Sequence, residues 1–176
     1  MDKGYVHIYT GDGKGKTTAA VGLGFRAYGR GFRVLLVQFL KNEPTGEIMA
    51  IEKLDSRFRY FRTKKVKGFF FSMNEEQKQE LKKSEQEAWE YAAKAVMSSK
   101  WDMVILDEVI GSINNKLVDL VAVKDLIKSK PEGIELVLTG RNAPEELKQL
   151  ADYVSEIKAV KHVFSRGIPA REGIED

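Results

Sequence analysis

A short segment rich in glycine and lysine, TGDGKGKT at residues 10–17, sets the strictest limit on what this chain can fold into. The apolar run at residues 5–10 predicts a short buried strand, and residues 17–28, rich in Ala and Gly, predict a helix. Such a segment between a strand and a helix is typical of a P-loop, which wraps the phosphate groups of a nucleotide. The sequence therefore predicts a nucleotide site, with ATP as the expected ligand.

The loop has the residue types that bind an anion. Glycines at positions 11, 13 and 15 let successive backbone N–H groups face inward around a phosphate. The helix that begins near Lys16 adds unpaired N–H groups and the positive end of its dipole. Lys16 brings a positive charge to the outer phosphates, and the Thr17 hydroxyl can bind Mg²⁺. The predicted ATP-binding residues are Gly11, Asp12, Gly13, Lys14, Gly15, Lys16, Thr17, Thr18 and, after a later strand, Arg141.

The loop departs from the strict P-loop pattern at its first position. That pattern has glycine at position 10, but Thr10 stands there, so the loop that starts at Gly11 is one residue shorter. A glycine-rich turn without a ligand is the alternative interpretation. The Gly-Lys-Thr ending and the flanking strand and helix favour the nucleotide site.

Apolar runs alternate with helical segments along the rest of the chain. This alternation predicts an α/β fold with a mostly parallel β-sheet flanked by helices on both faces, as in P-loop NTPases of the RecA type. No repeat or linker divides the sequence, so one domain over residues 1–176 is expected. The further predicted strands are residues 33–40, 58–63, 103–106, 134–139 and 154–157, and the further predicted helices are residues 74–97, 117–128 and 144–151.

Two of these helices have a predicted amino-terminal cap. Asn74 with Gln77 resembles a capping box before the first of them. Asn142 with Glu145 predicts a cap before the last, with Pro144 in the first turn, where proline is tolerated.

Polar residues follow the predicted strands at the rim where ligands bind in open α/β sheets. A P-loop requires an acidic metal partner at the end of a neighbouring strand, and Asp107 and Glu108 meet this requirement. Arg141 is expected to contact phosphate, although helix capping or a surface position would also explain it. Gln38 and Lys41 share the same rim.

Composition narrows the class of protein. The chain of 176 residues is 43% apolar and 31% charged, as in soluble globular proteins. It has no cysteine, which excludes disulfides, thiolate metal sites and cysteine nucleophiles. No apolar run reaches the roughly 18 residues of a membrane-spanning helix, and Met1 leads into the first strand without a signal region. A cytoplasmic enzyme without membrane contact is expected.

A basic segment at residues 57–67 interleaves six Arg and Lys residues with aromatic ones. This pattern resembles a strip that binds single-stranded nucleic acid. An edge strand protected by charge is the simpler interpretation. The net charge of only +3 does not indicate a nucleic-acid protein, so nucleic acid is not expected as a partner.

An ordered set of motifs resembles the ATP:corrinoid adenosyltransferases of cobalamin synthesis and salvage. The resemblance covers nearly the whole chain. Only the loop is specific by itself, but the ordered set is strongly specific. The motifs are GDGKGKTTAA at residues 11–20, VQF at 37–39, LDE at 106–108, TGR at 139–141, KH at 161–162 and GIE at 173–175.

The resemblance implies an unusual reaction. Members of the family transfer the adenosyl group of ATP to the cobalt of a reduced corrinoid and release inorganic triphosphate. It also implies that the nucleotide lies reversed in the shortened loop, with the γ-phosphate where other P-loop enzymes hold the α-phosphate. The ribose 5′-carbon then faces the cobalt. Co(I) is itself a strong nucleophile, which suits a sequence whose two histidines, His7 and His162, are not persuasive bases.

The resemblance also assigns roles by position. Lys16 and Glu108 are the implied catalytic residues, which hold and neutralise the departing triphosphate. The implied ligands of a divalent metal, Mg²⁺ or Mn²⁺, are Thr17 and Glu108. Asp107 is implied to contact the metal through water.

An aromatic segment, GFFFS at residues 68–72, matches the family segment that packs beneath the corrin ring. The implied corrinoid-binding residues are Phe69 and Phe71, which would keep the lower ligand off cobalt so that Co(II) is easier to reduce. Without the resemblance, three adjacent phenylalanines would be interpreted as core or as a flap over it.

The chain departs from its relatives at several points. Many relatives have Trp at the position of Phe71 and Asn at that of Asp12, whose carboxylate is expected to point away from phosphate. Some relatives have an amino-terminal helical extension over the site, whereas this chain begins at its first strand, so a partner subunit or the phenylalanine segment is expected to cover the corrinoid. The family further implies a flavoprotein-type reductase as electron donor and a possible homodimer.

Two other hypotheses remain open on the sequence alone. One is a small-molecule kinase or ATPase on the same scaffold, which cleaves the γ-phosphate. The other is a non-catalytic nucleotide- or RNA-binding module that uses residues 57–67.

Overall fold

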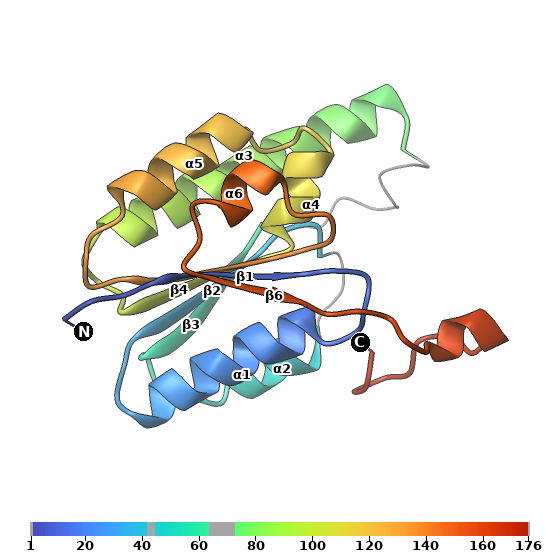
Figure 1. Ribbon diagram of the computed structural model, residues 1–176, viewed down its shortest axis with the longest axis horizontal. Coiled ribbons are helices and arrows are strands. Elements are labelled where there is room, and N and C mark those ends of the chain that lie inside the picture. The colour runs from blue at the N-terminus through green and yellow to red at the C-terminus, as the bar shows by residue number, and fades with distance from the viewer. Residues whose placement is uncertain (1, 42–44, 64–72, 176) are drawn as a thin grey trace.

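A computed structural model describes residues 2–41, 45–63 and 73–175. In this part of the chain, six parallel strands form one sheet in the order β3-β2-β4-β5-β1-β6 (Figure 1). The strands are β1 (Val6–Thr10), β2 (Val34–Gln38), β3 (Phe58–Arg62), β4 (Met103–Asp107), β5 (Glu135–Thr139) and β6 (Tyr153–Glu156).

Helices cover both faces of this sheet. In Figure 1, α1 and α2 lie on one face, and α3, α4, α5 and α6 lie on the other. The predicted α/β fold with a parallel sheet between two helical layers is therefore confirmed. The helices are α1 (Lys16–Gly29), α2 (Gly46–Ile51), α3 (Glu75–Met97), α4 (Val109–Asn114), α5 (Leu120–Ser129) and α6 (Glu145–Lys148), followed by a 3₁₀ helix at Val163–Arg166.

The central strands of the sheet are almost entirely apolar because both of their faces are covered. Every residue of β2 and β4 is buried, because helices cover both sides of these strands. Along β2, Leu36 packs with the α1 layer, whereas Leu35 and Val37 pack with the α3 layer. Alternate side chains thus join two cores, one on each face of the sheet.

The long helix α3 begins as predicted. The Asn74 side chain accepts the N–H of Gln77, and the Gln77 side chain accepts the N–H of Asn74, so the capping box is complete. The predicted cap by Asn142 is wrong, since α6 begins after Pro144 without a side-chain cap. Asn142 instead has a left-handed backbone with φ of 54°.

Other predicted boundaries shift for local reasons. The helix predicted at residues 117–128 starts later, at Leu120, because Asp119 caps it by accepting the N–H of Val121 at 3.0 Å. Leu117 and Val118 are buried in the turn before it. The helices α2 and α4 have only six residues each and were not predicted.

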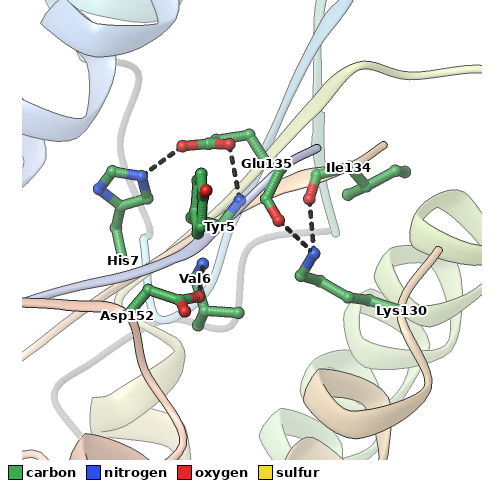
Figure 2. Close-up of polar contacts among 8 residues, drawn as sticks. Tyr5, Val6, His7, Lys130, Ile134, Glu135 and Asp152 are labelled. Carbon is green, nitrogen blue, oxygen red and sulfur yellow. Dashed lines mark hydrogen bonds and ion pairs between the residues drawn. The ribbon is translucent and has the colours of Figure 1, made fainter. Parts of the chain in front are cut away.

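A polar network joins the first strand to its neighbours at the edge opposite the phosphate loop (Figure 2). The Glu135 carboxylate accepts the N–H of Tyr5 at 2.8 Å and a hydrogen bond from the His7 ring. Asp152 accepts the N–H of Val6 at 2.8 Å. The Lys130 ammonium donates to the carbonyl oxygens of two further residues, Gly4 and Ile134. This edge is held by side chains as well as by the sheet ladder.

Glu135→Ala should lower the free energy of unfolding by about 1–3 kcal/mol at neutral pH, because the Tyr5 N–H and the His7 ring would lose their acceptor. Burial opposes ionisation of Glu135, but hydrogen bonds from His7 and Tyr5 outweigh it and hold the pKa of the carboxyl below its usual value. A lowered pKa in the folded state contributes stability above the unfolded pKa of about 4.3. The difference between wild type and variant should therefore shrink as the pH falls through the folded pKa.

Urea unfolding between pH 3 and pH 7 measures this difference. The matched control is Glu132→Ala, which removes an exposed carboxylate from the turn before β5. Equal losses in both variants, or a difference that grows towards low pH, would contradict the role given to Glu135.

Among the described residues, no helix is both long enough and apolar enough to span a bilayer.

Candidate active site at the carboxyl edge of the sheet

Four neighbouring strands end in polar residues at one edge of the sheet. These are Thr10 of β1, Thr139 of β5, Asp107 of β4 and Gln38 of β2. Because the strands are parallel, their carboxyl ends meet at this edge, where open α/β sheets bind ligands. The loop from β1 to α1 starts here, which places the predicted phosphate site beside the acidic residues.

The phosphate loop is packed against the residue that follows β6. The N–H of Gly13 donates to the carbonyl oxygen of Ile157 at 2.7 Å. Gly11 has φ of 103°, and a Cβ at this position would lie only 2.4 Å from the same Ile157 oxygen. Gly15, with φ of 115°, is the N-cap of α1. Both positions therefore require glycine, as the sequence predicts.

Lys16 spans the curled loop from within. Its ammonium donates to the carbonyl oxygens of Gly11 at 2.8 Å and Gly13 at 2.9 Å. Burial lowers the pKa of Lys16, and the nearby Glu108 carboxylate opposes this shift. The residue is 8% exposed, so its positive charge is held within the loop rather than in solvent.

The predicted acidic pair follows β4 directly. Asp107 is fully buried, and its Oδ1 accepts hydrogen bonds from the hydroxyls of Thr17 at 2.8 Å and Thr139 at 2.7 Å. The Thr139 hydroxyl in turn accepts the N–H of Glu108 at 2.9 Å. Asp107 thus ties the start of α1 to the ends of β4 and β5.

Glu108 adopts an unusual conformation at the start of α4. Its φ is 61°, in the left-handed region that few residues other than glycine adopt. Burial raises the pKa of Glu108, and the neighbouring Asp107 carboxylate raises it further. The cations that oppose this rise are Lys41, Lys16 and Arg141. Glu108 is therefore a half-buried carboxylate with cations around it.

A cavity of about 770 Å³ opens over these residues. Every predicted ATP-binding residue from position 12 to position 18 lines it, together with Glu108 and Arg141. Gly11 lies at the base of the loop, where its carbonyl oxygen binds Lys16. The carboxyl-terminal segment forms another wall of the cavity, with His162 and Glu175 among its lining residues.

Comparison with known proteins decides which family this site belongs to. Residues 2–175 match the profile of the ATP:corrinoid adenosyltransferase family BtuR/CobO/CobP. The chain belongs to this family. The corrinoid adenosyltransferase of Escherichia coli K12 is 33% identical over 175 residues, which cover 99% of this chain and 86% of that protein.

Two further relatives have similar identity. The corrinoid adenosyltransferase CobA of Salmonella typhimurium is 34% identical over 176 residues, which cover 99% of this chain and 86% of that protein. A corrinoid adenosyltransferase of Sinorhizobium sp is 36% identical over 176 residues, which cover 99% of this chain and 81% of that protein. The resemblance inferred from the ordered motifs is confirmed.

The oxygen atoms around Thr17 fit a hard divalent cation better than a soft one. Thr17, Asp107 and Glu108 offer a hydroxyl and two carboxylates at the start of α1 and the end of β4. Across residues 2–41, 45–63 and 73–175, no three His, Asp or Glu side chains form a metal cluster. A cation here would therefore need phosphate oxygens or water as further ligands, which is the usual situation of Mg²⁺ in nucleotide enzymes.

The loop and helix after β2 add groups that the sequence did not indicate. Gln38 donates from Nε2 to Glu47 of α2 at 3.0 Å, and Glu47 and Thr45 line the cavity. Nothing in the sequence pattern singles out Glu47, because α2 is too short to show a helical period. The capping residue Thr45 immediately before a Gly-Glu pair is the only local signal.

The phenylalanines assigned to the corrinoid, Phe69 and Phe71, lie outside the described residues. The described part of the basic segment, residues 57–63, contains edge strand β3. Just before this strand, Arg57 pairs with Asp55 at 2.6 Å and lies over the Tyr28 ring at 4.8 Å. This pairing is what the charged edge-strand interpretation predicts for Arg57.

Proposed function

We propose that this adenosyltransferase moves the 5′-deoxyadenosyl group of ATP onto the Co(I) centre of a reduced corrinoid and releases inorganic triphosphate. The observation that carries the proposal is the shortened phosphate loop, closed by Lys16 and placed beside Glu108 in a cavity large enough for a nucleotide. The family match over residues 2–175 supports the same reaction.

The loop is proposed to hold the triphosphate end of ATP. Backbone N–H groups of the loop and the amino terminus of α1 favour an anion at this place. Lys16 is already positioned there by Gly11 and Gly13, so its charge needs little rearrangement to meet a phosphate. Arg141, exposed at the cavity wall, is proposed to contact the same triphosphate.

A divalent metal, Mg²⁺ or Mn²⁺, is proposed to be held by Thr17 and Glu108, with Asp107 contacting it through water. The Thr17 hydroxyl already lies 2.8 Å from Asp107, which orients its oxygen. When bound, such a cation neutralises negative charge on triphosphate. Glu108 would gain a further cationic neighbour in this arrangement, which offsets the cost of its partial burial.

The reaction balances without a protein base. The Co(I) electron pair attacks the 5′-carbon of ATP, a cobalt–carbon bond forms, and the carbon–oxygen bond to the α-phosphate breaks. Triphosphate leaves with the electron pair of that bond. The residues of the loop and rim therefore need only position ATP and stabilise the charge of the leaving group.

Product identity tests the proposal directly. The protein is incubated without oxygen with ATP, Mg²⁺ and chemically reduced cobalamin, and the products are followed by ³¹P NMR and by the cobalamin spectrum. We expect inorganic triphosphate and alkyl-cobalamin in equal amounts, the latter identified by its light-sensitive spectrum. ADP with inorganic phosphate would instead identify a kinase or ATPase.

RNA binding tests the remaining hypothesis. Binding to RNA that survives Lys16→Ala and weakens steeply with salt would identify a binding module.

Phe69 is proposed to pack against the lower face of the corrin, on the strength of the family resemblance. Phe69→Ala should slow the reaction at least about tenfold when Co(II) and a reductase are supplied, since removal of a contacting aromatic side chain costs on the order of 1–3 kcal/mol. The loss should be much smaller when Co(I) is supplied chemically. Equal losses from both oxidation states would contradict a role in removing the lower ligand.

A further inference from the structure

Helix α3 carries one carboxylate on its buried face. Glu85 is 3% exposed, and its neighbours on this face are apolar: Leu81 one turn before, and Ala88 and Trp89 one turn after. Burial of a carboxylate costs free energy unless its hydrogen bonds compensate, and an apolar side chain in its place is often neutral or stabilising. Packing alone therefore does not explain this residue.

The Glu85 carboxylate joins two segments that lead to the active-site rim. Its Oε1 accepts the N–H of Leu40, 3.1 Å away in the loop after β2. Its Oε2 accepts a hydrogen bond from the Ser112 hydroxyl, which is fully buried in α4. Leu40 has φ of 54°, a left-handed conformation that is uncommon for leucine, so the bond to its N–H stabilises a strained turn.

Both segments carry a charged group of the cavity next to the residue that Glu85 binds. Lys41 follows Leu40 and lines the cavity. Glu108 lies one turn before Ser112, whose N–H donates to the Glu108 carbonyl oxygen at 3.2 Å. The two segments also touch, because a Cβ at Gly111 would lie 3.0 Å from Leu40 Cδ1. A shift of either segment would therefore move charge at the rim.

We propose that Glu85 is a positioning residue of the active site, whose two hydrogen bonds fix the loop that carries Lys41 and the helix that begins at Glu108. This role rests on the proposed function, since both charged groups act on ATP only if the cavity binds its triphosphate. Glu85 does not line the cavity and touches no reactant. It acts by fixing the backbone positions of the two segments. The buried face of α3, which carries Glu85, packs on the opposite face of the sheet from the core of α1.

Hydrogen bonding rather than charge is the property that the position requires. Burial raises the pKa of Glu85, while the hydrogen bonds from Ser112 and Leu40 lower it. A neutral carboxamide can make the same two contacts, since its oxygen accepts from Leu40 and its NH₂ group donates to the Ser112 hydroxyl. An apolar side chain of similar size can make neither.

The variants Glu85→Gln and Glu85→Leu separate hydrogen bonding from packing. We expect the glutamine variant to keep kcat/KM for ATP within about threefold of wild type. The leucine variant should lose about tenfold or more, because small displacements of catalytic groups cost at least this much. The matched control is Val96→Ala, which removes a buried methyl pair about three turns away on the same helix. If the folded leucine variant loses no more activity than the control, the positioning role is overturned.

A second readout does not depend on activity. Hydrogen exchange of the Leu40 amide, followed by NMR on the free protein, should be slow in wild type and in Glu85→Gln. It should be about fivefold faster in Glu85→Leu, since one hydrogen bond of about 1 kcal/mol is lost. Unchanged exchange at Leu40 overturns the positioning role by itself. A wild-type protein that yields no adenosylated corrinoid overturns the proposed function instead, and leaves this exchange result to decide the structural role.

Discussion

Lys16→Ala should reduce adenosyl transfer by at least about a hundredfold, since loss of one preorganised donor to a developing charge costs roughly 10²–10³ in rate. Two carbonyl oxygens of the loop hold the Lys16 ammonium in place. The ammonium therefore already lies where the loop would bind a phosphate. The methylene stem lies at the first turn of α1, whose core contacts come from Ala20, Val21 and Ala27 further along. The helix should therefore remain folded.

Initial rates of triphosphate release and the midpoint of thermal unfolding measure both parts of this expectation. The control is Lys128→Ala, which removes an exposed lysine from α5 on the other face of the sheet and should leave the rate unchanged. A Lys16→Ala protein that stays active, or one whose loss of activity is explained by unfolding, would contradict a triphosphate site in the loop.

Glu108→Gln should raise the metal concentration needed for half-maximal activity by about ten- to a hundredfold, the range seen when groups around a bound metal are changed. The amide keeps the shape of the side chain but removes its negative charge. The effect on the rate at saturating metal should be smaller. The left-handed backbone of residue 108 is unchanged by this substitution, so α4 should start at the same place.

Metal titrations with Mg²⁺ and with Mn²⁺ test the role of Glu108. Glu90→Gln is the matched control, since it makes the same change at an exposed position of α3. A variant with the metal requirement of the wild type and a lower maximal rate would show that Glu108 acts on ATP in some other way.

The sheet was predictable because its central strands are apolar throughout. Residues 33–40 and 103–106 have no polar face. In a chain whose strands and helices alternate, this predicts strands covered by helices on both sides. Both strands were found, with ends within two residues of the predicted ones. The boundaries failed where a single side chain decides them. Asp119 moves the start of α5, and Pro144 rather than Asn142 precedes α6. Competition between such caps depends on tertiary neighbours that the sequence does not reveal.

The position of the glycine-rich loop at residues 10–17 and that of Asp107 and Glu108 at the end of β4 were predictable, because their spacing reflects local chemistry. A glycine-rich turn between a strand and a helix, and carboxylates after a buried strand, need no knowledge of the rest of the chain. Glu85 and Glu47 were not found, since their roles depend on segments 45 and 9 residues away that meet only after folding. A carboxylate within the apolar stripe of α3 was the one available signal for Glu85.

The direction of the bound nucleotide tests the central claim most directly. A crystal structure of the protein with ATP, Mg²⁺ and no corrinoid would show which phosphate lies in the loop. We expect the γ-phosphate beside Lys16 and the ribose 5′-carbon turned towards the open side of the cavity. A nucleotide whose α- and β-phosphates fill the loop, with the terminal phosphate facing an acceptor pocket, would contradict adenosyl transfer.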